Sequence, residues 1–587
     1  MNIPKTRAKQ AHLAESAEAS GATANRISGS VAAVSMLQEF GVKHIFGVCG
    51  DTSLPFYDAL RSVGNSIRHV LARDERCAAY MADVYARITG RVGVVEGPSG
   101  AGATYMLPGI VEAQGTTIPV LAITSDIPVT GRDKFVLTEC DQESLFRPFT
   151  KYTRVVEQAT CIPTAFRAAF TAMTSGTPGT AHIGLPYDVL KADLPANDVW
   201  GDPTLGQYPS RPQQPDDDKL EAAAELIRTS RRPIIITGGG TLHAMAHMEL
   251  IQLAEIINAP VGTTISAKGT IAETHELALG TIGTNGSTPG ARDAVRESDL
   301  VIYVGCRVGS VTSEKGANPV NGEKPIIHID IDPICIGANY KTDVALPGHA
   351  KLTLAALIKK LEARQDRSVQ SGWGREAVCR AKDIRRALFM KHAASNDVPI
   401  YPERIIAEMQ KALPDDVIVI SDPGTPTPYL CAFYETRQSG RSFIFHRFHG
   451  GLGFSLPGVV GAYFAAPGRK IVGIMGDGSF GFSSGELETI SRLNLPVTLI
   501  VINNASFGWI KAGQQQSYGG RFFGVDFSKS DHAAIAAAYG LKTWKVERPE
   551  QLAGALSNAI ASAGPTLVEI ITRPLEQSEV PVTAYLG

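Results

Sequence analysis

The 587-residue chain is 44% hydrophobic and 19% charged, with a formal net charge of −2. These values are typical of a large globular enzyme, and they give no support for binding to nucleic acid or to an anionic membrane. The eight cysteines form no CxxC pair, which favours reduced thiols in a cytoplasm over a disulfide scaffold or a zinc site. No apolar run approaches about 18 residues, so we expect no transmembrane helix.

Helices, short apolar strands and Gly-rich turns alternate along most of the chain, which predicts an α/β fold with doubly wound, mostly parallel sheets. Two stretches interrupt this alternation, one rich in Pro and Asp and the other charged and helical. The pattern therefore predicts three α/β domains, two linkers and two tails. In order, these are a mobile tail at 1–24, a first domain at 25–195, a linker at 196–217, a central domain at 218–363, a helical linker at 364–400, a third domain at 401–575 and a C-terminal tail at 576–587.

Two turns of the first domain carry candidate functional residues. Glu75 follows a short strand at 69–71 and opens the next helix, so it lies at a sheet edge. Judged from the residues alone, it is an acid placed where the helix dipole favours negative charge. A later strand, 92–95, leads into the Gly-rich turn Gly97–Gly102.

Two apolar runs of the third domain end in polar residues. Residues 471–475 lead into Gly476-Asp477-Gly478-Ser479, and residues 497–502 lead into Asn503-Asn504. Buried parallel strands deliver both ends to one sheet edge, where open α/β sheets bind ligands. The carboxylate and the amide oxygen suit Mg²⁺, and the glycines let backbone N–H groups approach phosphate oxygens. The pattern predicts a magnesium–phosphate site, and its alternative is a plain Gly-rich turn.

A helix should follow this turn. Ser483 and Glu486 have the spacing of a capping box, which predicts that the helix opens there.

The GDG turn and the Asn pair together resemble the diphosphate-binding motif of thiamin-diphosphate (ThDP) enzymes. The resemblance is greatest to the group that contains acetolactate synthase, benzoylformate decarboxylase, oxalyl-CoA decarboxylase and 2-hydroxyacyl-CoA lyase. It implies Mg²⁺ bound by Asp477, Asn504 and the backbone carbonyl of Ser506. It also implies a pyrimidine-binding first domain, a central domain and a diphosphate-binding third domain.

The same resemblance assigns the residues next to the reacting part of the cofactor. Arg73-Asp74-Glu75 and Ala82–Arg87 are similar to the family segment that carries the essential glutamate, although Asp74 replaces a frequent His and Val84 a frequent Gly. Glu75 would hydrogen-bond N1′ of the aminopyrimidine. In the run 449–457, Leu452 would wedge beneath the cofactor, and the Gly450 carbonyl would accept a hydrogen bond from its 4′-amino group.

Further contacts with the cofactor are implied on three short segments of the third domain. The loop at 421–425 matches a family loop that touches diphosphate, although a Pro-Gly turn explains it equally well. For Trp509, a role in the core is as well supported as a ligand role. The implied contacts are Gly424, Thr425, Gly476, Gly478, Ser479, Phe507, Gly508 and Trp509.

The residues expected near the substrate depart from the family patterns. The turn at Gly97–Ser99 lacks the histidine of benzoylformate and pyruvate decarboxylases, which favours carboligation or lyase chemistry. Yet the Phe-Gln pair of acetolactate synthases is Leu137-Thr138 here, and their substrate-binding Trp is replaced near Gly513. The candidate substrate contacts are Asp51, Gly97, Ser99, Thr138 and His449. A histidine at 446 or 449 can shuttle protons, although a structural role is favoured for both.

These observations predict a ThDP/Mg²⁺-dependent enzyme that makes or breaks a carbon–carbon bond next to a carbonyl. We expect an acetolactate-synthase-like carboligase or decarboxylase of 2-keto acids, acting through an enamine of the cofactor. The rival is a 2-hydroxyacyl-CoA lyase or an oxalyl-CoA decarboxylase, and a non-catalytic protein of the same fold is a further alternative.

The resemblance also bears on the central domain and on assembly. Relatives carry FAD or ADP in the central domain, and Gly238–Gly240, Arg307 and Asp330 fall in the corresponding region, where an empty domain is the third alternative. The family site lies between subunits, so we expect a homodimer or homotetramer in the cytoplasm that acts on a small molecule.

Overall fold

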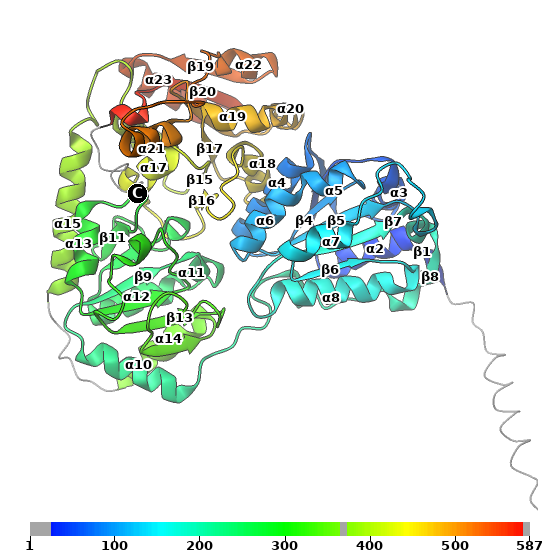
Figure 1. Ribbon diagram of the computed structural model, residues 1–587, viewed down its shortest axis with the longest axis horizontal. Helices are drawn as coiled ribbons and strands as arrows, with labels where there is room; N and C mark the ends of the chain where they lie inside the picture. Colours follow the sequence, from blue (N-terminus) through cyan, green and yellow to red (C-terminus); the bar gives the residue numbers. More distant parts are fainter. Residues whose placement is uncertain (1–24, 364–371, 579–587) are drawn as a thin grey trace, which may run out of the picture.

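The computed structural model describes residues 25–363 and 372–578, which form three six-stranded parallel sheets flanked by helices (Figure 1). This arrangement confirms the predicted fold class. A separate antiparallel ribbon pairs β1 (Arg26–Ser28) with β8 (Asp193–Pro195). The tail predicted at 1–24, residues 364–371 of the predicted helical linker and residues 579–587 of the C-terminal tail lie outside the described residues.

The first and third sheets share one strand order, in which the first strand of the domain lies between the second and the third. Successive connections therefore leave this strand in opposite directions, and the point of reversal is where open α/β sheets bind ligands. The first sheet runs β3 (Arg68–Leu71), β2 (His44–Gly47), β4 (Gly93–Gly97), β5 (Val120–Asp126), β7 (Ala181–Pro186), β6 (Tyr152–Val155). The third runs β16 (Phe443–Phe445), β15 (Ile418–Ser421), β17 (Ile471–Gly476), β18 (Thr498–Asn503), β20 (Thr566–Ile571), β19 (Lys542–Val546).

The central sheet has the strand order of dinucleotide-binding folds, with the reversal between β9 and β12. It runs β11 (Ala278–Thr281), β10 (Val261–Thr263), β9 (Pro233–Thr237), β12 (Leu300–Val304), β13 (Ile326–Asp330), β14 (Val344–Pro347). The segment predicted as a helical linker holds α15 (Trp373–Met390), whose buried Trp373 and Ala377 belong to the same apolar cluster as Ile234 of β9. This helix therefore packs on the central domain.

Helices cover both faces of each sheet because their apolar stripes pack on the strands. In the first domain they are α2 (Gly29–Glu39), α3 (Leu54–Ser62), α4 (Glu75–Thr89), α5 (Ala101–Tyr105), α6 (Leu107–Gly115), α7 (Gln142–Phe146), α8 (Ile162–Thr174) and α9 (Tyr187–Lys191). The central domain adds α10 (Asp217–Thr229), α11 (Gly239–His243), α12 (His247–Ile257), α13 (Pro289–Glu297) and α14 (Ala350–Ala363) to α15. The third has α16 (Pro402–Ala412), α17 (Pro426–Phe433), α18 (Ser455–Ala465), α19 (Asp477–Ser483), α20 (Leu487–Arg492), α21 (Gly508–Tyr518), α22 (His532–Ala538) and α23 (Leu552–Ala561).

The first and third domains meet where α4 packs against α18 (Figure 1). Asp74 caps the N-terminus of α4 by accepting the Arg76 N–H, and Gly90 ends it in the left-handed region at φ 72°. On α18, Gly461 lies so close to α4 that an added Cβ would be 2.2 Å from the Met81 carbonyl oxygen. A glycine at 461 thus permits the close approach of the two helices.

The prediction that Ser483 and Glu486 open a helix as a capping box is wrong. The helix α19 begins at Asp477, directly after β17, and ends at Ser483. The Ser483 hydroxyl is buried and makes no capping hydrogen bond. Glu486 instead accepts the backbone N–H of Arg73, 2.8 Å away in the first domain. The capping-box pattern is local, whereas this acid is used in a contact between domains.

Candidate active site

The structure brings Asp477, Asn504 and Ser506 together beyond the ends of β17 and β18. Burial raises the pKa of Asp477 to about 6, and its carboxylate interacts with the backbone N–H groups of Ala505 and Ser506. Its Oδ1 accepts the Gly478 N–H at 2.9 Å, whereas its Oδ2 is buried and has no hydrogen-bond partner. Asn504 Oδ1 lies 3.3 Å from both the N and the Oγ of Ser506. A buried carboxylate oxygen without a partner, beside an amide oxygen, fits a site that receives a cation.

Asn503, the first residue of the Asn pair, has a different environment from Asn504. Its Nδ2 donates to Glu569 Oε1 at 2.7 Å, and its Oδ1 accepts the Ala505 N–H at 3.0 Å. Glu569 also lies 2.8 Å from His532 Nδ1. Asn503 and Glu569 therefore hold the turn that presents Asn504, and Glu569 has no signal in the local sequence.

The loop after β15 lies beside this turn, at the reversal between β15 and β17. A Cβ added to Gly508 would lie 2.5 Å from Asn504 Nδ2 and 3.0 Å from Thr425 Oγ1, so these three residues are neighbours. Gly424 has φ 104°, which favours glycine there. The predicted loop, the GDG turn and the Asn pair therefore converge at one edge of the third sheet.

Asp422 connects this loop to the segment that carries Leu452. Its buried carboxylate accepts the N–H groups of Phe454 and Ser455 at 2.9 and 3.0 Å, and the Ser455 hydroxyl at 2.8 Å. Gly450 and Gly453 lie in the left-handed region at φ 75° and 82°. Leu452, between these two glycines, is half-buried. Asp422 thus anchors the C-terminal side of the Gly450–Leu452 segment, a role that sequence reasoning missed.

The remaining cofactor candidates surround the GDG turn. A Cβ added to Gly478 would lie 2.8 Å from the Phe507 ring, which makes an edge contact with Phe527. Ser479 is buried, and Gly476 is half-buried. Trp509 packs against the apolar core of the third domain, which agrees with a core role.

Glu75 is buried at the start of α4, against the Gly-rich turn of its own domain. A Cβ added to Gly97 would lie 3.1 Å from Glu75 Cγ, and one added to Gly102 would lie 3.0 Å from Glu75 Oε1. Any larger side chain at these two positions would displace the carboxyl. Burial raises the pKa of Glu75, which favours the neutral form that can donate a hydrogen bond.

The loops expected to face the substrate meet through hydroxyl groups. The Ser99 and Thr138 hydroxyls lie 2.6 Å apart, and Thr52 Oγ1 lies 3.2 Å from Ser99 Oγ and 2.8 Å from Ser125 Oγ. Asp51 is exposed beside this group. Sequence reasoning missed Thr52 and Ser125, although Thr52 follows β2 at the reversal point of the first sheet.

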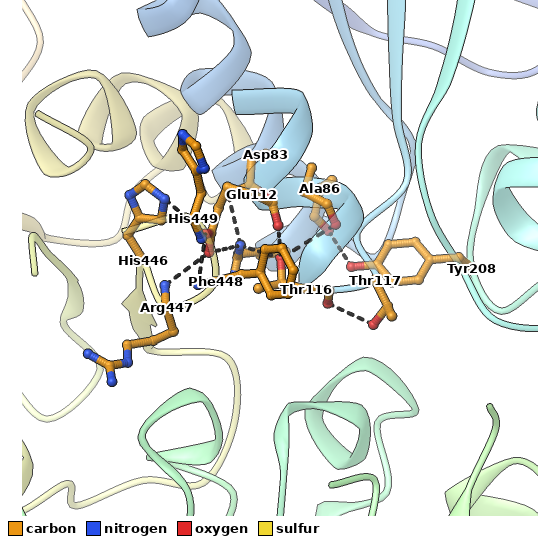
Figure 2. Close-up of polar contacts among 12 residues, drawn as sticks. Asp83, Ala86, Glu112, Thr116, Thr117, Tyr208, His446, Arg447, Phe448 and His449 are labelled. Carbon is orange, nitrogen blue, oxygen red and sulfur yellow. Dashed lines mark hydrogen bonds and ion pairs between the residues drawn. The ribbon is translucent and has the colours of Figure 1, made fainter. Parts of the chain in front are cut away.

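The two candidate histidines differ in burial. His446 is buried, with Nε2 2.9 Å from a Glu112 carboxylate oxygen, and His449 is exposed (Figure 2). Glu112 lies within α6 in the first domain, and its carboxylate accepts backbone N–H groups of the loop that holds both histidines. The surroundings of His446 agree with a structural role.

Within the described part of the chain, no hydrogen bond or ion pair joins Glu75 to the third domain. Polar links near Glu75 come instead from its neighbours: the N–H of Arg73 donates to Glu486, and Arg76 donates to the Phe482 carbonyl at 2.5 Å. Glu75 thus belongs to the first domain and its Gly-rich turn, whereas Asp477 belongs to the strand edge of the third domain.

A cavity of about 470 Å³ lies at the reversal point of the central sheet. Three turns after β9, β12 and β13 line it, with Gly238–Gly240, Arg307 and Asp330 among them. Burial raises the pKa of Asp330 to about 6. The three predicted central-domain features therefore share one cavity, and Gly115 of the first domain and Arg447 and Phe448 of the third also line it.

Neither a metal-binding cluster of His, Cys, Asp and Glu side chains nor a long apolar helix occurs in residues 25–363 and 372–578. No group of three or more His, Cys, Asp or Glu side chains there could hold a metal ion, so any metal beside Asp477 would need oxygen ligands from amides, carbonyls or a bound phosphate. None of the helices in these ranges is long and apolar enough to span a membrane.

Comparisons with known proteins agree with this architecture. Three domain families of thiamine pyrophosphate (TPP) enzymes match the chain, and TPP is another name for ThDP. They are the N-terminal TPP binding domain at 27–145, the central domain at 220–357 and the C-terminal TPP binding domain at 422–570. The chain is 35% identical to probable acetolactate synthase large subunits of Methanococcus aeolicus and Methanocaldococcus jannaschii, over 93% of this chain and 92% of each relative. It is 30% identical to the acetolactate synthase isozyme 3 large subunit of Escherichia coli, over 91% of this chain and 92% of the relative. With three matched domains in order and relatives along nearly its whole length, the chain belongs to the thiamine pyrophosphate enzymes.

Proposed function

We propose that this chain is an acetolactate-synthase-like enzyme that uses ThDP and Mg²⁺ to make or break the carbon–carbon bond next to the carbonyl of 2-keto acids. The observation that carries the proposal is the buried, partnerless Oδ2 of Asp477 beside Asn504 and Ser506. It lies in a chain that is 35% identical to probable acetolactate synthase large subunits. Mg²⁺ would bind to Asp477, Asn504 and the Ser506 carbonyl, with diphosphate oxygens completing its ligands.

The chain's own residues would bind and orient the cofactor and would hold a proton at its pyrimidine ring. Gly424, Thr425, Gly478 and Ser479 would bind the diphosphate, and Leu452 would support the cofactor. Glu75 would hold a proton at the pyrimidine nitrogen, a task that its raised pKa favours. ThDP, when bound, supplies the electron sink for the carbanion.

The groups near the substrate favour transfer of the carbanion to a second carbonyl compound over its simple protonation. Ser99, Thr52 and Thr138 present hydroxyl groups, and the Gly97–Ser99 turn carries no imidazole. Neutral hydroxyls of ordinary pKa are poor proton donors at neutral pH. They are well suited to hydrogen-bond the carboxylate or carbonyl of a 2-keto acid.

We also propose that the active site is completed by a second copy of the chain, in a homodimer or a homotetramer. Within the described residues, no hydrogen bond or ion pair joins Glu75 to the Asp477 group of the same chain. Large apolar side chains near both are exposed in the single chain: Phe135 by 100%, Leu137 by 86% and Phe523 by 88%. Exposed apolar groups of this size mark protein interfaces.

The central cavity, we propose, takes a nucleotide, either FAD or ADP. Its location at the reversal point of a sheet with dinucleotide-binding order supports this class. The visible absorbance spectrum of the purified protein and chromatography of the released nucleotide distinguish the two. A cytoplasmic location is proposed because all eight cysteines are free thiols.

The test of the reaction uses the purified full-length protein with ThDP and Mg²⁺. With pyruvate, we expect acetolactate and CO₂. In a parallel incubation with a 2-hydroxyacyl-CoA, formation of an aldehyde and formyl-CoA without acetolactate in the first incubation would contradict the proposal.

A further inference from the structure

A carboxylate of the first domain binds three consecutive backbone amides of the third domain (Figure 2). Glu112 is fully buried within α6. Its Oε1 accepts the N–H of Arg447 at 3.0 Å, and its Oε2 accepts the N–H groups of Phe448 and His449 at 2.9 and 2.7 Å. Hydrogen bonds to a charged acceptor are stronger than neutral ones, so this loop is strongly held from another domain.

A guanidinium, an imidazole and backbone amides keep Glu112 ionised in this buried place. Arg87 Nη2 lies 3.2 Å from Oε1, and His446 Nε2 lies 2.9 Å from Oε2. Burial alone would raise the pKa of Glu112, but His446, Arg87 and the amides outweigh burial and hold this pKa well below its ordinary value. The carboxylate is therefore charged at neutral pH and available to the loop amides.

The side chains of Phe448 and His449 contribute little to fixing the loop, whereas that of Arg447 is half-buried and lines the central cavity. Phe448 is 58% exposed, and His449 and Gly450 are exposed. The nearest support for Phe448 is Gly115, together with the Arg307 guanidinium 5.8 Å from its ring. The positions of Phe448 and His449, which lead into Gly450, therefore depend mainly on the backbone hydrogen bonds to Glu112.

We propose that Glu112 is a positioning residue for the cofactor segment Gly450–Leu452. The last amide that it binds belongs to His449, which is followed directly by Gly450. Asp422 fixes the other end of the segment through Phe454 and Ser455. One acid from each domain thus sets where the Gly450 carbonyl and the Leu452 side chain lie. This inference rests on the cofactor roles proposed above for Gly450 and Leu452.

The sharpest variant is Glu112→Gln, because it keeps the size of the side chain, removes its charge and turns an NH₂ group towards donors. We expect the dissociation constant for ThDP, measured by calorimetry with Mg²⁺, to rise about tenfold or more. Hydrogen exchange of the amides of 447–449 should accelerate in the cofactor-free protein. Glu112→Asp keeps the charge and should partly restore both the ThDP affinity and the slow hydrogen exchange.

Asp83→Asn is the matched control. Asp83 is also fully buried, lies in the same cluster and pairs with Arg87 at 2.8 Å, but none of its hydrogen bonds reaches the loop. The Asp83→Asn variant should lower the melting temperature, as Glu112→Gln does. Its ThDP affinity and the hydrogen exchange of the amides at 447–449 should stay close to those of the wild type. A merely structural cluster would affect both variants alike.

The outcomes separate the two proposals. Wild-type affinity for ThDP in Glu112→Gln, or an equal loss in Asp83→Asn, would overturn the positioning role. Failure of the wild type to bind ThDP would instead overturn the proposed function. If Glu112→Gln does not fold, Glu112→Asp decides the positioning role through the same two measurements.

Discussion

Buried acids in this protein differ in the groups that face them, and these groups decide whether each acid is charged or protonated. Glu112 faces the Arg87 guanidinium and three backbone amides and stays charged, whereas Asp477 has one carboxylate oxygen without a partner. Glu96, at the end of β4, is buried with Oε2 accepting the Tyr57 hydroxyl at 2.7 Å and Oε1 without a partner. The three environments respectively suit holding a loop, receiving a cation and retaining a proton.

The proton on Glu96 predicts how stability depends on pH. Burial raises its pKa from 4.5 to about 8. Between these values the folded state keeps a proton that the unfolded state has lost, so the stabilisation is complete below pH 4.5 and disappears as the pH rises towards 8. The loss is at most about 1.4 kcal/mol per pH unit.

Glu96→Gln removes this titration and keeps an acceptor for Tyr57. Melting temperatures of the variant and the wild type, compared at about pH 5 and about pH 7.5, should show a variant that gains relative stability at the higher pH. An equal difference at both values would show that Glu96 ionises normally.

Asp477→Asn tests the proposed metal site. The amide keeps the size of the side chain but removes the charge that a hard cation requires. We expect Mg²⁺-dependent binding of ThDP to weaken by about tenfold or more in calorimetric titrations. Unchanged affinity would place the metal elsewhere.

Glu75→Gln tests the proposed proton-holding acid. Because the Asp477 half-site is intact, binding of ThDP and Mg²⁺ should persist, while turnover falls by about 100-fold or more. Full turnover in steady-state assays of this variant would contradict the assignment of Glu75.

At the scale of elements, shared strand order explains where the candidate residues lie. In the first and third sheets, the first strand lies between the second and the third, so successive strands are added on opposite sides of it. The loops that follow the first and third strands therefore lie side by side. Thr52 and Ser99 meet there in the first domain. In the third domain Thr425 follows the first strand and lies beside Asn504, which follows the fourth strand, β18. The packing of α4 on α18 then sets the two domains against each other.

Gly461→Ala should weaken this helix packing. Its Cβ would lie 2.2 Å from the Met81 carbonyl oxygen, so the helices must separate, at a cost of about 1–3 kcal/mol. Gly554 of α23 has no heavy atom within 4 Å of an added Cβ, and Gly554→Ala should stabilise by about 0.5–1 kcal/mol. Melting temperatures that shift in the same direction would contradict this account.

At the scale of the whole molecule, the proposal is that each half-site of one chain is completed by the other half-site of a second copy. The exposed Phe135, Leu137 and Phe523 lie on the loops nearest to them. Burying these side chains against a second copy would remove apolar area from water and close the space around the cofactor.

Mixing two inactive variants tests this arrangement. In a hybrid dimer of Glu75→Gln and Asp477→Asn chains, one site combines both substitutions and the other has neither. Random exchange of subunits should therefore restore about a quarter of the wild-type activity. If each site lay within one chain, the mixture would stay inactive in the same assay.

The sequence by itself determined the features that depend on neighbouring residues. Apolar runs followed by polar turns located the ends of β17 and β18, and with them Asp477 and Asn504, because strand periodicity and turn chemistry are local. The alternation of helices and strands likewise determined the α/β class, and the motif spacing indicated the family.

Tertiary structure alone decided what depends on residues far apart in the chain. Glu112 meets the loop at 447–449 across more than 300 positions, and a mid-helix glutamate carries no signal of such a partner. Glu486 reads as part of a capping box but binds Arg73 in another domain, since the energy of a buried contact exceeds that of a local cap. Strand order, which brings Thr52 to Ser99 and Thr425 to Asn504, is likewise a property of the folded sheets, because no local pattern records which strands become neighbours.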